Sequence, residues 1–135
     1  MKFPTPGSSI GLFAMFGRSS DLRQLDEAFR SVDVHPRMIP EAVKLTIAKL
    51  LKEDSDGAPT PDQYRRAAEI VGYCTIGPNG FAGANGEELM NRVEQRIEIA
   101  LGAETSLDAQ LILLTLHAKL IQPSVVDMFD LESSG

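Results

Sequence analysis

The sequence contains three side chains that could together form a small nucleophilic or ligand-binding site. Cys74 is the single cysteine of the chain and His117 is one of its two histidines. Gln110 precedes His117 by seven residues, so on a helix the two side chains lie about 20° apart around the axis. An imidazole can activate a neighbouring thiol as a nucleophile. Cys74, Gln110 and His117 therefore define a candidate pocket.

The same residue types have an ordinary structural interpretation. A cysteine is commonly an inert buried residue, and a lone histidine usually belongs to the core or its rim. No local signature of a cysteine enzyme surrounds Cys74, so the sequence identifies no catalytic residue. One cysteine and two histidines also exclude a multi-cysteine zinc site. We expect neither a metal ion nor a cofactor.

Residues 77–86, "GPNGFAGANG", place a glycine at every third position and resemble a phosphate-binding loop at first sight. Such a loop needs a lysine and a hydroxyl residue, and this stretch has no lysine. Two glutamates also follow it, where a helix start would otherwise attract an anion. We expect a joint instead: Gly77 ends a third helix, Phe81 anchors the connection to the core, and Asn85 caps a fourth helix.

Apolar residues recur along most of the chain at spacings of three and four, the period of an amphipathic helix. Sheet-like alternation is almost absent. The pattern predicts an all-α fold, a single-domain bundle of five main helices with a short C-terminal helix. The expected main helices follow Ser20, Pro40, Thr60, Asn85 and Ser106, and the short one begins at about Pro123.

The segment at about 106–121 differs from the other expected helices because its apolar residues point in all directions. A helix of this kind is buried on most sides, so we expect it to be the central helix of the bundle. Residues 1–9 contain two prolines and predict an extended N-terminal arm. The helical domain then covers residues 10–130, and residues 131–135 form a frayed C-terminal tail.

The stretch "IGLFAMF", residues 10–16, is an unbroken run of apolar residues and one glycine. Phe13, Met15 and Phe16 are adaptable apolar groups of the kind found at interfaces. They either clamp onto the core of their own chain, which is the usual place for such residues in a single domain, or contact another protein. They form the candidate interface.

Composition limits the partners. The 135 residues suit one domain, and a net charge of −6 with a pI near 4.8 disfavours binding to nucleic acid phosphates. No apolar run approaches the ~20 residues of a membrane span, and the N-terminus lacks a clear signal peptide. A single free thiol fits a reducing compartment. We expect an acidic, soluble, cytoplasmic protein with no nucleic acid and no membrane partner.

Two functional hypotheses remain open. The first is a helical module, not an enzyme, that acts through protein–protein contact and associates with itself as a homo-oligomer such as a homodimer. The alternative is a small-ligand-binding protein or enzyme, with a pocket beside the central helix lined by Gln110, His117 and Cys74.

Overall fold

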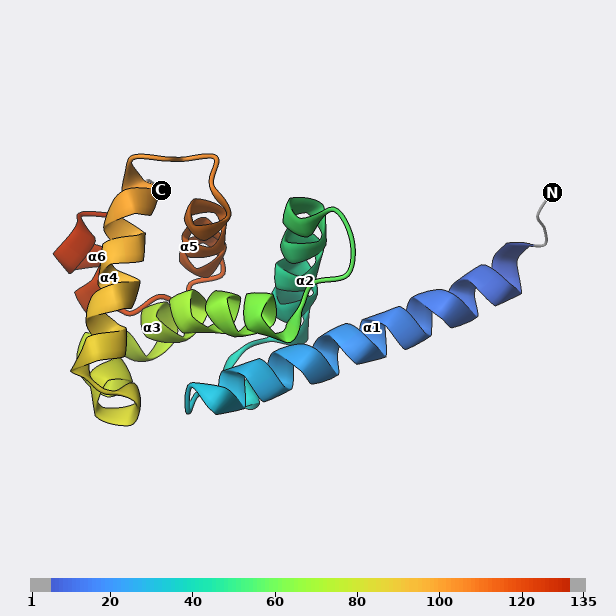
Figure 1. Ribbon diagram of the computed structural model, residues 1–135, viewed down its shortest axis with the longest axis horizontal. Coiled ribbons are helices and arrows are strands. Elements are labelled where there is room, and N and C mark those ends of the chain that lie inside the picture. Colours follow the sequence, from blue (N-terminus) through green and yellow to red (C-terminus); the bar gives the residue numbers. More distant parts are fainter. Residues whose placement is uncertain (1–5, 132–135) are drawn as a thin grey trace.

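Six α-helices and one short 3-10 turn make up the regular structure in the part of the chain that the computed structural model describes. That part comprises the backbone of residues 6–131 and the side chains of residues 18–131. It contains no strand, so the predicted all-α fold is confirmed (Figure 1). The helices are α1 (Pro6–Ser31), α2 (Glu41–Ser55), α3 (Pro61–Asn85), α4 (Glu87–Leu101), α5 (Leu107–His117) and α6 (Pro123–Phe129), and the 3-10 turn is Pro36–Met38.

The helix at the centre of the fold is α3, which contacts each of the other five helices (Figure 1). Its residues 70–75 are all buried, so burial extends around its whole circumference. Small residues permit this close packing: a Cβ atom added to Gly72 would lie 3.0 Å from Cγ2 of Val34, in the segment that leaves α1. Neighbouring segments therefore approach α3 from several sides.

The expectation that residues 106–121 form the central helix is corrected by this arrangement. α5 is shorter than expected and packs against one side of α3. Its buried residues are Ala109, Leu111, Ile112 and Thr115, whereas Leu113 is 45% exposed. α5 is apolar all round because one side packs on the core and another lines a hollow on the surface, described below.

α1 begins earlier than the sequence predicted. Residues 6–9, expected to be an extended arm, belong to α1, and residues 1–5 lie outside the described part of the chain. Pro6 is the first helical residue, a position that suits proline because its nitrogen needs no helical partner there. No proline lies between Pro6 and Ser31, and the helix is continuous through Ser20, after which the sequence predicts its start.

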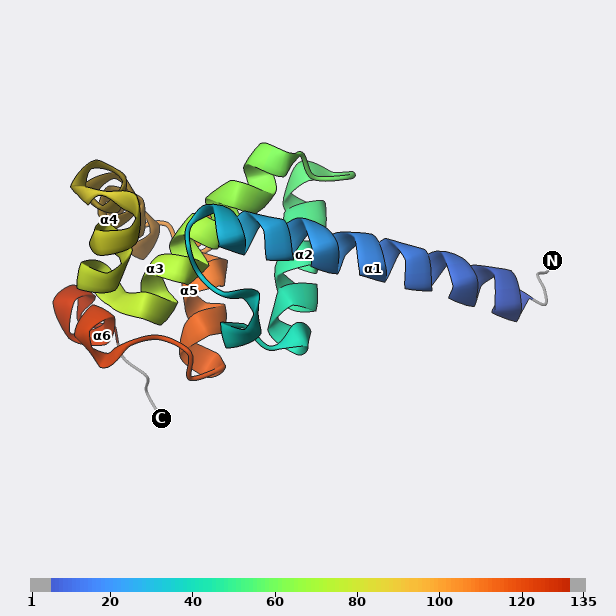
Figure 2. The ribbon, with the colours of Figure 1, turned by 90° about the horizontal axis from the view of Figure 1, so that it is seen from below.

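The first half of α1 extends beyond the other helices, past α2 and away from α4 and α6 (Figures 1 and 2). The second half packs on α2 and α3. There Leu25 and Phe29 are fully buried, and Lys44 of α2 donates a hydrogen bond of 2.7 Å to Asp26. The candidate interface residues Phe13, Met15 and Phe16 lie in the first half, and their side chains are outside the described residues.

The glycine-rich joint is present, in a form that differs in two respects from the prediction: α3 does not end at Gly77 but continues to Asn85, and Asn85 is not the cap of α4. Gly77 has φ 84° and ψ 169° and kinks α3, and Pro78 restarts the helix. Phe81 is fully buried, and its ring and that of Tyr73 form a T-shaped pair with a centroid distance of 5.7 Å. Asn85 does not cap α4. Its amide instead donates to the carbonyl of Val32 at 2.9 Å, which ties the joint to the end of α1.

Replacing Gly77 by alanine is expected to lower the free energy of unfolding by about 1–3 kcal/mol, because this backbone region is essentially reserved for glycine. Space is not the obstacle, since the nearest neighbour of an added Cβ, in Gln122, would be at an ordinary 3.5 Å. Urea denaturation measures the change. Gly83→Ala is the matched control: Gly83 is exposed, helical and open around its Cβ, so alanine there should be neutral or stabilising. Equal stability of the two variants would contradict the conclusion that the backbone conformation at Gly77 requires glycine.

Candidate functional site

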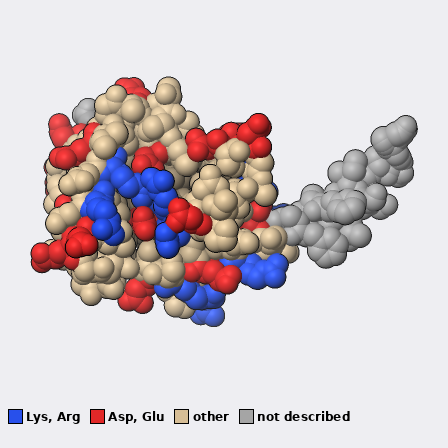
Figure 3. Space-filling view, viewed as in Figure 1, with Lys and Arg blue, Asp and Glu red and all other residues tan. Residues whose placement is uncertain are grey.

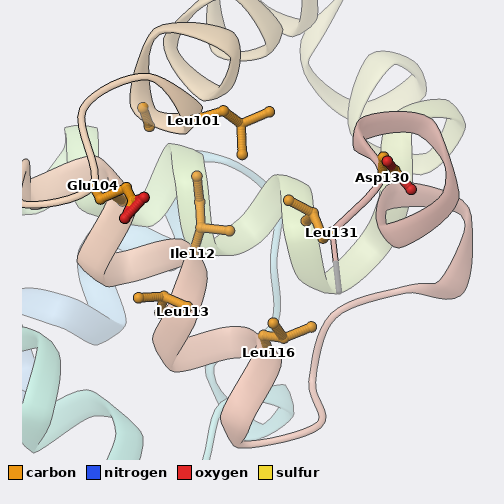
Figure 4. A pocket seen from close by; sticks show the side chains of 9 residues that line it. Leu101, Glu104, Ile112, Leu113, Leu116, Asp130 and Leu131 are labelled. Carbon is orange, nitrogen blue, oxygen red and sulfur yellow. The ribbon is translucent and has the colours of Figure 1, made fainter. Parts of the chain in front are cut away.

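A hollow of about 290 Å³ opens between the end of α4, one side of α5 and the residues that follow α6 (Figure 4). We call it the α4–α5 pocket. Its floor is apolar and buried, formed by Ala100, Ala109 and Ile112. The remaining lining residues are Leu101, Leu113, Leu116, Leu131, Glu104 and Asp130.

Local backbone signals put these side chains around one hollow. Gly102 ends α4, and the Ser106 side chain accepts a hydrogen bond from the Ala109 N–H and caps α5 after a short loop. After α6, Asp130 adopts a left-handed conformation with φ 53°, and the Leu131 N–H donates to the Val126 carbonyl at 2.9 Å. This turn reverses the chain and brings Leu131 to the pocket wall beside α5 (Figure 4).

The pocket combines an apolar interior with acidic side chains. Leu101 and Leu113 are each 45% exposed, so large apolar groups face solvent at its edge. Its two polar lining residues, Glu104 and Asp130, are both acidic and exposed. Neither forms an ion pair with a residue whose side chain the structure describes. The lining offers a ligand apolar contact and two carboxylates, and it contains no thiol, hydroxyl or imidazole.

The structure does not bring the three sequence-predicted pocket residues to one surface. Cys74 is fully buried in α3, whereas Gln110 and His117 are exposed on α5. Gln110 donates from its side-chain amide to the carbonyl of Thr105, which closes the first turn of α5. The thiol of Cys74 has the Thr115 hydroxyl as its hydrogen-bond neighbour instead of His117.

Burial is the main influence on Cys74. It raises the pKa of the thiol from 9.0 to about 12, and the hydrogen bond with Thr115 opposes this only in part. A buried, protonated thiol is a poor nucleophile, because the thiolate is the reactive form.

Cys74 should therefore react very slowly with a thiol reagent in the folded protein at neutral pH. Raising the pKa from 9.0 to about 12 lowers the thiolate fraction about a thousandfold, and burial blocks access further. Labelling with a chromogenic disulfide, followed by absorbance, measures the rate. The same protein in denaturant is the control and should react at once. Rapid labelling of the folded chain would contradict an inert core cysteine.

A cluster of arginines and carboxylates occupies another face, where blue and red atoms interleave in Figure 3. Arg96 of α4 is its centre. Its guanidinium pairs with Glu69 of α3 at 3.0 Å and with Asp108 of α5 at 2.9 Å, and it also donates to the Arg66 carbonyl. The Arg96 side chain is 17% exposed. The cluster joins three helices by charge pairing, so its charges are largely engaged within the fold.

Arg96→Leu is expected to lower the free energy of unfolding by about 2–3 kcal/mol, since it leaves two partly buried carboxylates without their partner. Thermal or urea denaturation measures this. Arg92→Leu is the matched control on the same helix, because the Arg92–Glu88 pair is exposed and 3.5 Å long. Such a surface pair should change stability by less than about 1 kcal/mol. Similar losses in both variants would show that the Arg96 pairing is not what joins the helices.

The sequence interpretation missed the α4–α5 pocket. Its signal was present: the apolar residues all around 106–121 indicated burial on every side, and one of those sides faces a hollow instead. The contribution of Leu131 had no signal, because it depends on a turn at Asp130 that one sequence does not specify.

Comparison with models of protein families, with curated proteins and with solved structures found no match for this chain. Among the described residues, no helix combines the length and apolar character needed to cross a membrane.

Proposed function

We propose that this chain is a cytoplasmic helical module that acts through protein contact, and that two copies associate through the apolar stretch 10–16. The observation that carries the proposal is the path of α1. Its first half leads away from the other helices (Figures 1 and 2), and its sequence there is the apolar run "IGLFAMF".

The alternative for residues 10–16, a clamp on the core of the same chain, requires this stretch to lie beside the other helices. The backbone of α1 carries it away from them (Figures 1 and 2). Apolar groups outside a core gain free energy when another surface covers them. An aromatic side chain buries about 150–250 Å² when covered, so Phe13 and Phe16 supply a large part of the area that a contact needs.

Charge indicates which part of the chain two acidic copies can bring together. Each copy carries a net charge of −6, so two copies repel one another over most of their surfaces. Residues 1–20 contain no carboxylate, and their charged side chains are Lys2 and Arg18. This segment is therefore the part of the chain that a second copy repels least.

Replacing both phenylalanines by serine, in Phe13→Ser/Phe16→Ser, should weaken self-association at least about tenfold, because the double substitution removes the aromatic anchors. Sedimentation velocity and native mass spectrometry over a range of concentrations measure the change. Phe13→Leu/Phe16→Leu is the matched control and should still associate.

Circular dichroism should report the same thermal unfolding of the core for the serine and leucine variants when each is a single copy. The proposal is wrong if the unmodified chain remains a single copy at every concentration, or if the serine variant associates as well as the leucine variant.

A further inference from the structure

We infer that the α4–α5 pocket receives the apolar stretch 10–16 of a second copy of this chain. The inference rests on the proposed self-association and names the surface on which the stretch docks. It combines three observations: the opposite placement of stretch and pocket, their apolar match, and the absence of carboxylates from the segment that contains the stretch, against the acidic side chains of the pocket.

The stretch and the pocket lie at opposite ends of one molecule. Figures 1 and 2 agree that the start of α1 lies at one end and that α4 and α6 lie at the other. A continuous helix from Pro6 to Ser31 holds the stretch there. A chain with this geometry does not fill its own pocket, so the occupant comes from another copy. Two copies can exchange stretches reciprocally and close as a pair, while one-way exchange extends a chain of copies.

The pocket suits an apolar occupant of limited size. Ala100, Ala109 and Ile112 give it a buried floor, and the half-exposed Leu101 and Leu113 flank it. A hollow of about 290 Å³ is at the small end of ligand sites and takes about one or two large apolar side chains. Aromatic anchors seated in such hollows supply much of the binding energy at protein interfaces. The stretch 10–16 offers two phenylalanines for this role.

The charge of the α4–α5 pocket is compatible with this segment. Its polar lining residues are both acidic, Glu104 and Asp130, and the segment around the stretch is basic. Residues 1–20 contain two basic residues, Lys2 and Arg18, and no carboxylate, and Arg18 pairs with Glu41 of its own copy at 2.8 Å. The hollow around Arg96 is lined by four arginines and two carboxylates, so its excess of positive charge suits a basic segment less well.

The first experiment places a charge in the pocket of the full-length chain. The variant is Leu113→Glu. The leucine is 45% exposed, so the fold should tolerate the substitution, but a carboxylate at this position opposes an apolar occupant. Self-association measured by sedimentation velocity should fall at least about tenfold. Ile99→Glu is the matched control: it adds the same charge to a 72% exposed isoleucine of α4 outside this pocket, and association should be unchanged.

The second experiment separates donor from receptor. A fluorescent peptide of residues 1–18 is titrated with full-length Phe13→Ser/Phe16→Ser, which keeps the pocket but has lost the anchors. The peptide should bind, and adding Leu113→Glu to the receptor should weaken binding at least about tenfold, whereas adding Ile99→Glu should not.

The outcomes separate the inference from the proposed function. If the serine double variant is a single copy but Leu113→Glu still associates, the stretch docks elsewhere: the pocket inference is wrong and self-association stands. Peptide binding that Leu113→Glu leaves unchanged, or no peptide binding at all, also overturns the inference. If the unmodified chain never associates, the proposed function fails, whatever the peptide does.

Discussion

The close packing around α3 is the constraint on which the rest of the fold depends. Gly72 illustrates this packing, because a Cβ atom there would press on the side chain of Val34. A glycine in a helix interior lowers stability by roughly 0.5–1 kcal/mol relative to alanine. At Gly72 the lack of a side chain permits the close approach of Val34. The chain leaving α1 can cross α3 at short range, and α4, α5 and α6 pack on the remaining sides. A larger residue at Gly72 would require the Val34 side chain, just after the end of α1, to shift by a few tenths of an ångström.

Much of the fold could be predicted from the sequence because it is encoded by local signals. A helix is predicted after Thr60, and there Thr60 and Gln63 form a reciprocal capping box. The kink at Gly77 follows from a glycine and a proline in succession. The central helix could not be predicted in the same way. Apolar residues on every side of 106–121 and small residues within α3 both indicate burial, and only the assembled packing decides which helix is surrounded.

The candidate site was less predictable than the fold. Cys74 and His117 are candidates because of their residue types, but reactivity also depends on exposure. Cys74 is buried, whereas His117 is exposed. The α4–α5 pocket is built from leucines and alanines, the commonest core residues, so no residue type marks it. The shape of the pocket depends on how the end of α4, α5 and the turn at Asp130 come together in space. The residue types at these positions do not predict that arrangement.

The continuity of α1 has a consequence for how its first half meets a partner. A short helix on its own is marginally stable in water, because the first turn must be nucleated before hydrogen bonds accumulate. Here the second half of α1 is fixed in the core, so the nucleus already exists and the first half only propagates it. The apolar stretch is thus already helical in the single chain. In the proposed association, it would lose less conformational entropy on docking than an unstructured tail.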